Sequence, residues 1–182
     1  YAVVTRGFAP MGGVRAQLKS YAKKRKFRAG GCFYVDFPNN DVTLFDIYSK
    51  EKNDKLLASV PAAHERVVRL INASRAHFDF EPFAFMLYFR HRGAYLDRLK
   101  DFGKEFHADD RCNGCGLCAK VCPADNITMV AGRPQWSDGC VLCEACLNWC
   151  PTQALQFGRA TSQKGRYHHD AVKVTDMTTQ KS

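Results

Sequence analysis

Cysteine spacing is the feature that most constrains what this chain can fold into. Eight of its nine cysteines lie between residues 112 and 150. They form two runs of the pattern C-x2-C-x2-C-x3-C, each followed by proline: Cys112, Cys115, Cys118 and Cys122, then Cys140, Cys143, Cys146 and Cys150. The second run repeats the first at an offset of 28 residues, and Ile127 aligns with Leu155 at the same offset. We infer an internal duplication of one small unit.

Three kinds of chemistry use cysteines in such numbers. Disulfides suit secreted chains, but no export signal is visible and cysteines this close in sequence bridge poorly. Zinc sites use C-x2-C pairs separated by a longer arm, and three cysteines in succession do not divide into such pairs. The remaining chemistry is iron–sulfur, because this run with its proline is the bacterial pattern for [4Fe–4S] clusters. The sequence therefore predicts two [4Fe–4S] clusters.

The spacing also predicts how the ligands are shared. Three cysteines on a tight loop can reach three corners of one cubane, while the fourth begins a helix that faces the other cluster. Cluster I is then expected to use Cys112, Cys115, Cys118 and Cys150. Cluster II is expected to use Cys140, Cys143, Cys146 and Cys122.

Residues between the ligands differ in the two repeats. Gly114 and Gly116 let the backbone wrap closely around a cluster, and Leu142 and Glu144 take their places in the second repeat. We expect Glu144 to be a solvated loop residue; the alternative is that it alters the potential of cluster II.

Short strands are predicted around the cysteines. Residues 127–130 and 134–136 should form a hairpin through the turn at 131–132, and residues 154–157 should form the matching strand of the second repeat. Ile127, Met129, Leu155 and Phe157 are expected to pack over the clusters and exclude water. Trp136 and Trp149 are expected to shield the clusters, with electron conduction as the alternative.

Charge is distributed unevenly along the 182 residues. The formal net charge is +9, yet residues 107–157 carry three basic and five acidic side chains. The basic run at 23–28 is best explained as a solvated helix end, so nucleic acid is not the favoured partner. The longest apolar run, residues 82–89, is shorter than the 20 residues or so that a membrane span needs, and no such span is predicted. Cubane clusters favour a cytoplasmic location.

The first hundred residues are expected to be α/β. A strand at 2–5, helical periodicity from Val14 to Tyr21 and a strand at 32–37 form a βαβ unit with a parallel sheet. Two such strands make no stable open sheet, which favours strands missing upstream. Helices are predicted from Ser59, as N-cap with Pro61 in the first turn, to about residue 78, and over 82–106, with a turn near 77–81. Cys32 should be a buried free thiol.

Residues 107–157 resemble the dicluster 2[4Fe–4S] ferredoxins. Together with the βαβ opening and the tail RYHHDAVKVTDM, they resemble the EFR1-type ferredoxins, which place a flavodoxin-like domain before a two-cluster domain. This implies an N-terminally truncated α+β chain: a partial flavodoxin-like segment with a helical linker (1–106), a ferredoxin domain (107–157) and a polar tail (158–182). The loop around Thr5, Arg6, Gly7 and Gly12 would then contact a flavin. No flavodoxin phosphate loop is present, so FMN is expected only with the missing upstream segment.

Electron transfer through the two clusters, with a redox protein as partner, is the function that the sequence favours. No nucleophile constellation or P-loop is apparent, so the chain is expected to be a carrier rather than a catalyst. The alternative is a flavin-dependent oxidoreductase whose clusters feed electrons to a substrate. A third hypothesis is a nucleic-acid binding module in which the clusters are structural, and its binding would weaken steeply with salt.

Overall fold

The computed structural model describes residues 1–7, 13–79 and 101–179, so most of the predicted helix over 82–106 lies outside the described residues. The chain divides into two compact units. The first comprises Tyr1–Asn39 and Tyr48–Gly93, and the second comprises Asn40–Ile47 and Ala94–Ser182. No helix of the described residues is long and apolar enough to cross a membrane.

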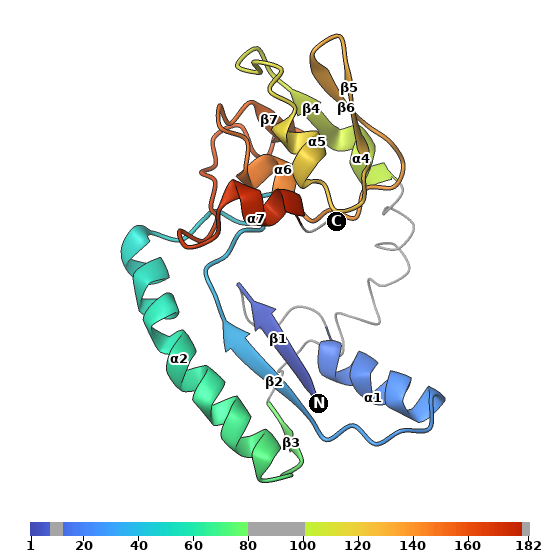
Figure 1. The fold of residues 1–182 in the computed structure, drawn as a ribbon, viewed down its shortest axis with the longest axis vertical. Coiled ribbons are helices and arrows are strands. Elements are labelled where there is room, and N and C mark those ends of the chain that lie inside the picture. Colours follow the sequence, from blue (N-terminus) through green and yellow to red (C-terminus); the bar gives the residue numbers. More distant parts are fainter. Residues whose placement is uncertain (8–12, 80–100, 180–182) are drawn as a thin grey trace. The chain divides into compact units, whose positions relative to one another are not determined.

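The first unit is built on a parallel sheet in the order β1-β2-β3 (Figure 1). Strand β1 (Ala2–Arg6) leads through helix α1 (Val14–Lys24) to strand β2 (Gly31–Asp36), and the two strands pair in parallel, as predicted. Five consecutive residues of β2, from Gly31 to Val35, are buried, as expected of a strand covered on both faces. Cys32 is a buried thiol with no exposed surface, and it forms no disulfide among the described residues, as predicted.

Helix α2 (Lys50–Asn72) begins ten residues earlier than predicted. Its N-cap is Ser49, whose side chain accepts a hydrogen bond from the backbone N–H of Lys52 at 3.3 Å. The predicted N-cap, Ser59, and Pro61 both lie inside the helix. The prediction was wrong because the first turns carry solvent-exposed charges rather than apolar residues, with an ion pair between Lys50 and Asp54.

The segment predicted as a turn before residue 81 contains a third strand. Strand β3 (His77–Phe78) pairs in parallel with Gly31 and Cys32. Asp79, which follows it, accepts hydrogen bonds from the backbone N–H of Tyr34 at 2.8 Å and from both terminal nitrogens of Arg66. The end of β3 is therefore fixed to β2 and to α2. The core beneath is formed by Phe33, Val35 and Val67.

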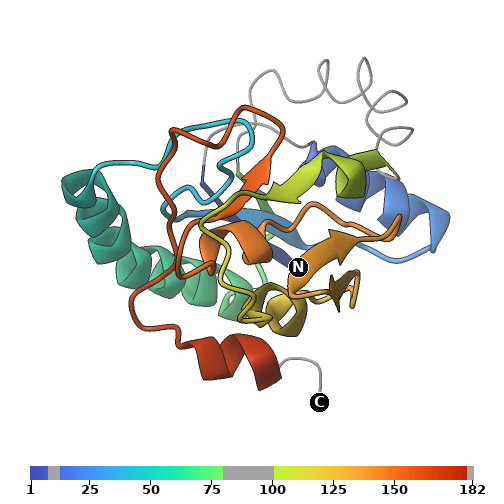
Figure 2. The same cartoon turned by 90° about the horizontal axis from the view of Figure 1, so that it is seen from above.

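The second unit contains two small antiparallel sheets. Helix α4 (Phe102–Glu105) leads into strand β4 (Phe106–Ala108), and β4 pairs with β7 (Leu155–Phe157), as Figures 1 and 2 show. Strand β5 (Ile127–Val130) pairs with β6 (Arg133–Trp136), which confirms the predicted hairpin. The turn residues Ala131 and Gly132 both have positive φ, at 48° and 76°, as a two-residue hairpin turn of type I′ requires.

The 28-residue repeat of the sequence is also a repeat of the backbone. Ile127 pairs with Trp136 in one sheet, and Leu155 pairs with Ala108 in the other, each partner displaced by 28 residues. Left-handed backbone positions repeat at the same offset, namely Gly114 with Leu142, Gly116 with Glu144 and Asp125 with Gln153. The two halves are thus related in register and in local conformation.

Three further helices complete the second unit: α5 (Leu117–Val121), α6 (Ala145–Asn148) and α7 (Val174–Thr179). The unit extends beyond the predicted ferredoxin limits in both directions, and the predicted domain boundaries stay a prediction. Residues 40–47 belong to it, with Val42 fully buried and its carbonyl accepting from Lys164 Nζ at 2.9 Å. Part of the expected polar tail is also buried, since Thr161 has no exposed surface.

Candidate iron–sulfur site

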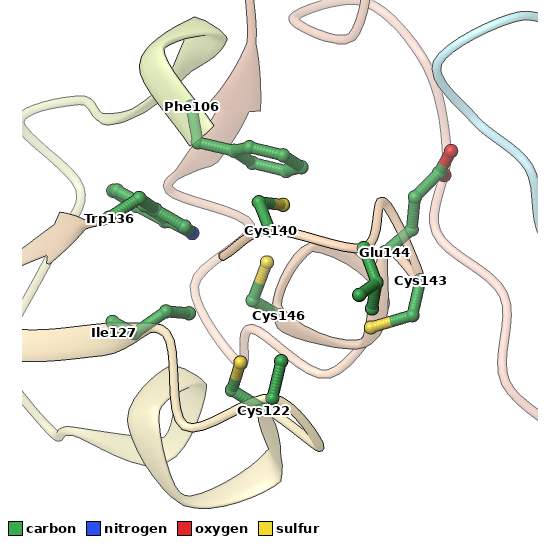
Figure 3. A pocket seen from close by; sticks show the side chains of 10 residues that line it. Phe106, Cys122, Ile127, Trp136, Cys140, Cys143, Glu144 and Cys146 are labelled. Carbon is green, nitrogen blue, oxygen red and sulfur yellow. The ribbon is translucent and has the colours of Figure 1, made fainter. Parts of the chain in front are cut away.

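The eight clustered cysteines line two small cavities, four in each. The first cavity is lined by Cys112, Cys115, Cys118 and Cys150. The second cavity is lined by Cys122, Cys140, Cys143 and Cys146, and Figure 3 shows their side chains around it. The grouping is the one expected from the sequence: each cavity takes three cysteines from one repeat and the fourth from the other. The assignment of these residues as cluster ligands remains a proposal.

Local backbone geometry places each group of cysteines. Gly116, with φ of 69°, precedes α5, and Glu144, with φ of 59°, precedes α6, so each ligand loop reverses into a helix through a left-handed residue. Cys118 lies in α5 and Cys146 in α6, while Cys122 follows the end of α5 in extended conformation. The helices carry the fourth cysteine of each run away from the loop that holds the first three.

Burial and crowding keep several of these thiols protonated in the absence of metal. Burial raises the pKa of Cys118 to about 11, and the neighbouring Cys115, Cys150 and Cys112 add to the effect although the backbone N–H of Ala119 opposes it. Burial likewise raises the pKa of Cys140, Cys143 and Cys146. Metal binding requires thiolates, so loading this site must release protons.

Hydrogen-bond donors lie close to the sulfur atoms of both fourth-position cysteines, Cys150 and Cys122. Burial acts to raise the pKa of Cys150, but the Thr152 side chain and the backbone N–H groups of Leu155, Ala154 and Thr152 outweigh it and lower that pKa. The Thr152 Oγ1 atom lies 3.6 Å from Cys150 Sγ. In the second cavity, the backbone N–H of Asn126 donates to Cys122 Sγ at 3.4 Å. Donors aimed at sulfur are the environment that a thiolate-bound cluster needs.

The lining of the cavities fits an iron–sulfur group. Ile127, Phe106 and Trp136 line the second cavity, and Met129 and Leu155 line the first. Of the four residues predicted to pack over the clusters, Ile127, Met129 and Leu155 therefore line a cavity and exclude water from it. Phe157 packs against the core of the unit instead of lining either cavity. In the described part of the chain, no three His, Cys, Asp or Glu side chains converge as a single ion would require. Four cysteines line each cavity, which is the number of ligands that one [4Fe–4S] cluster takes.

Glu144 is not the solvated loop residue that we expected. Only 5% of its surface is exposed, and its carboxylate accepts a hydrogen bond from the backbone N–H of Val42 at 2.7 Å. Burial, together with the nearby Asp41, raises the pKa of Glu144 to about 7, although Thr43 and the Val42 N–H act in the opposite direction. The prediction failed because the partner segment lies a hundred residues away in sequence and no local pattern marks it.

Asn126 and Arg166 are two further residues whose roles the sequence did not reveal. The Asn126 side chain donates to the Ser137 carbonyl and accepts from the Gly139 N–H, so it fixes the loop that leads to Cys140. Arg166 donates to the carbonyls of Leu155 and Lys164, both at 2.9 Å. No sequence motif surrounds Asn126 or Arg166, so the sequence gave no indication of these roles.

A larger cavity lies beside the second ligand loop. It encloses about 210 Å³ and is lined by residues that include Cys143, Tyr167, His168 and His169. His168 stacks on Trp149, with ring centroids 4.1 Å apart and planes inclined by 11°. Trp149 lines neither cysteine cavity, whereas Trp136 lines the second one, so the two tryptophans have different surroundings.

The predicted flavin contacts lie in the first unit, and Gly12 lies outside the described residues. Thr5 and Arg6 end β1, and Arg6 is paired with Asp36 at 2.5 Å. The Gly7 carbonyl accepts from Tyr48 Oη at 2.6 Å, and a Cβ at Gly7 would lie 2.7 Å from Asn39 Cα. These residues share the carboxyl edge of the sheet, and Arg6 and Gly7 already have protein partners.

Comparison with known proteins assigns the class of the second unit. Residues 111–155 match the family model of the 4Fe–4S dicluster domain. NADH-quinone oxidoreductase subunit I 2 of Geobacter metallireducens is 34% identical over 65 residues, covering 30% of this chain. The chain covers 50% of that relative's length. No solved structure matches the chain.

These findings and the cysteine geometry define a mixed α/β chain that contains a 4Fe–4S dicluster ferredoxin domain. They support iron–sulfur chemistry and indicate electron transfer.

Proposed function

We propose that this chain transfers electrons through two [4Fe–4S] clusters, one in each cysteine cavity, and exchanges them with a redox protein. One observation carries the proposal: eight cysteines form two groups of four, each completed by a cysteine from the other repeat. Interlocked ligand sets hold two clusters close together, as efficient electron passage requires. The relative from Geobacter, named as a subunit of an oxidoreductase, supports a redox role.

Each cavity has an outward-facing ligand. Cys115 and Cys143 are exposed, whereas Cys118, Cys122 and Cys146 are buried. The exposed thiols mark the edges of the two cavities that a redox partner could approach most closely. Each is the second cysteine of its run, so the 28-residue duplication relates these two exposed cysteines to each other.

Anaerobic reconstitution of the full chain tests the number of clusters. We expect about eight iron and eight sulfide per chain, and reversible bleaching of the visible absorbance by about two electrons. Cys112→Ser/Cys115→Ser should remove about half of the iron, and so should Cys140→Ser/Cys143→Ser. Cys32→Ser is the matched control, because Cys32 is a buried thiol in the first unit, and iron should be unchanged. One zinc per chain, or bleaching by one electron, would contradict the proposal.

We propose further that the first unit is a flavodoxin-like segment that exchanges electrons with a flavin, as in the EFR1-type ferredoxins. The parallel sheet and the close approach of Gly7 to Asn39 support it, since ligands of such sheets bind at the carboxyl ends of the strands. Titration of the chain with FMN, followed by flavin fluorescence, tests the proposal. Because the chain has no flavodoxin phosphate loop, no quenching is expected from it alone, and quenching that is lost in Gly7→Val would show that these residues bind FMN without that loop. Turnover of a substrate would instead favour the flavin-dependent oxidoreductase.

A further inference from the structure

Trp136 occupies a position beside the second cavity that has no counterpart at the first. It ends β6 opposite Ile127, and its ring stacks on Phe106 with centroids 5.5 Å apart and planes inclined by 18°. Figure 3 shows the nitrogen end of the indole directed into the cavity, toward the side chains of Cys140 and Cys146. Packing by Phe106 and pairing with Ile127 hold the ring in this orientation.

The indole nitrogen is buried and unpaired. Trp136 Nε1 has no hydrogen-bond partner among the described residues. Indole nitrogen can only donate, and leaving a buried donor without an acceptor is unfavourable. The cavity around it is lined by cysteine side chains and apolar carbon, and the carboxylate of Glu144, which also lines the cavity, points away from it (Figure 3).

The duplication explains why the first cavity has no donor equivalent to the indole N–H of Trp136. Trp136 pairs with Ile127, and at the 28-residue offset Ala108 pairs with Leu155. Alanine has no side-chain donor. The first cavity has Thr152 near Cys150 instead, at the fourth ligand rather than over the loop cysteines. The second cavity therefore has an aromatic N–H at a place where the first cavity has no side-chain donor.

We propose that the indole N–H of Trp136 donates a hydrogen bond to a sulfur atom of the cluster held by Cys122, Cys140, Cys143 and Cys146, and thereby raises the reduction potential of that cluster. The inference rests on the proposed function, since it requires a cluster in the second cavity. Reduction adds one electron from an external reductant, and no proton is transferred. The added negative charge strengthens the N–H···S interaction, so the donor stabilises the reduced state more than the oxidised one.

The test replaces only the N–H. In a Trp149→Phe background, Trp136 is the one remaining tryptophan, and it can be exchanged for benzothienylalanine, which keeps the ring shape and lacks the donor. Anaerobic EPR-monitored titration with dithionite should then show one of two midpoints lowered and the other unchanged. A five- to tenfold change in the equilibrium constant is expected for a hydrogen bond of about 1 kcal/mol, and tenfold corresponds to about 59 mV for one electron.

Two readouts separate this role from a packing role. ENDOR spectra compared in H2O and D2O should show one exchangeable proton coupling of the reduced cluster in the Trp149→Phe chain that is absent after the exchange, while couplings from backbone N–H groups remain. Trp136→Phe should give the same lowered midpoint, while Trp149→Phe alone should leave both midpoints where they are in the unmodified chain. If two clusters assemble and titrate but neither midpoint moves with the isostere, the inference fails and the proposed function stands. If two clusters do not assemble in the unmodified chain, the proposed function itself fails.

Discussion

The backbone N–H of Val42 donates to the carboxylate of Glu144 at 2.7 Å, and both residues are buried. This bond joins residues 40–47 to the second ligand loop, between Cys143 and Ala145. Asn148 strengthens the junction, because its side chain donates to the Asn40 carbonyl at 3.0 Å. A segment far from the cysteines in sequence therefore supports one ligand loop, and the first loop has a glycine at the position that Glu144 occupies.

Removing the Glu144 carboxylate should weaken the second loop. Glu144→Ala leaves the buried Val42 N–H without an acceptor, which costs about 1–3 kcal/mol. Glu144→Gln keeps an acceptor oxygen and is the matched control. Anaerobic denaturant titration of the loaded chain, followed by bleaching of the visible absorbance, should show a lower midpoint for Glu144→Ala than for Glu144→Gln. Equal midpoints for the two variants would show that the bond does not support the loop.

The two glycines of the first ligand loop should differ in their tolerance of a side chain. Both have positive φ, so alanine costs about 1 kcal/mol or more at either position. A Cβ at Gly114 would also lie 2.9 Å from the Gly132 carbonyl oxygen, whereas a Cβ at Gly116 would approach nothing closer than 3.8 Å. We expect Gly114→Ala to lower the iron content and the thermal midpoint of the loaded chain more than Gly116→Ala. The reverse order would contradict the close approach of Gly114 to the hairpin turn.

Arg166 should matter more to the stability of the second unit than other arginines of the tail. Its guanidinium binds the carbonyls of Leu155 and Lys164 and also the Gln156 side chain, so it ties the tail to β7. Arg166→Ala should reduce the free energy of unfolding by about 2–4 kcal/mol, and Arg166→Lys should recover only part of it because lysine lacks the planar fork. Tryptophan fluorescence reports on this unit, which contains both tryptophans. Exposed Arg159→Ala is the control and should have little effect.

The lowered pKa of Asp79 predicts that the first unit becomes less stable to unfolding at acid pH. Burial opposes ionisation, but the Arg66 side chain, the Tyr34 N–H and His77 more than compensate and lower the pKa of Asp79 to about 2. Because the folded pKa lies below the ordinary value of 3.8, this carboxylate stabilises the fold above pH 4, and the contribution is lost as the pH falls from about 4 to 2.

The contribution of Asp79 to the free energy of unfolding can be measured by denaturant titration, with the far-UV circular dichroism signal of helix, to which α2 contributes, as the readout. Asp79→Asn should cost about 1–2 kcal/mol at pH 7, and the difference from the unmodified chain should shrink toward pH 2. Asp54→Asn is the control, because its ion pair with Lys50 is exposed and such pairs contribute well under 1 kcal/mol. A difference for Asp79→Asn that is independent of pH would contradict the assignment.

Local sequence determined the features whose causes are local. Cysteine spacing predicted the two groups of four, the Ala131–Gly132 turn predicted the β5–β6 hairpin, and the strand–helix–strand pattern predicted the parallel pairing of β1 with β2. Each depends on covalent reach, on backbone conformation or on the hydrophobic period within a few residues, and these are properties that a sequence displays directly.

Tertiary structure decided the features that depend on distant neighbours. Only the fold pairs β4 with β7, buries Glu144 under Val42 and directs the Trp136 N–H toward the cysteines of the second cavity. The start of α2 at Lys50 was not predicted, because its first turns are charged and exposed and show no periodic spacing of apolar residues. A buried polar group is satisfied by whatever the chain brings to it, and the identity of that partner is set by long-range packing rather than by local pattern.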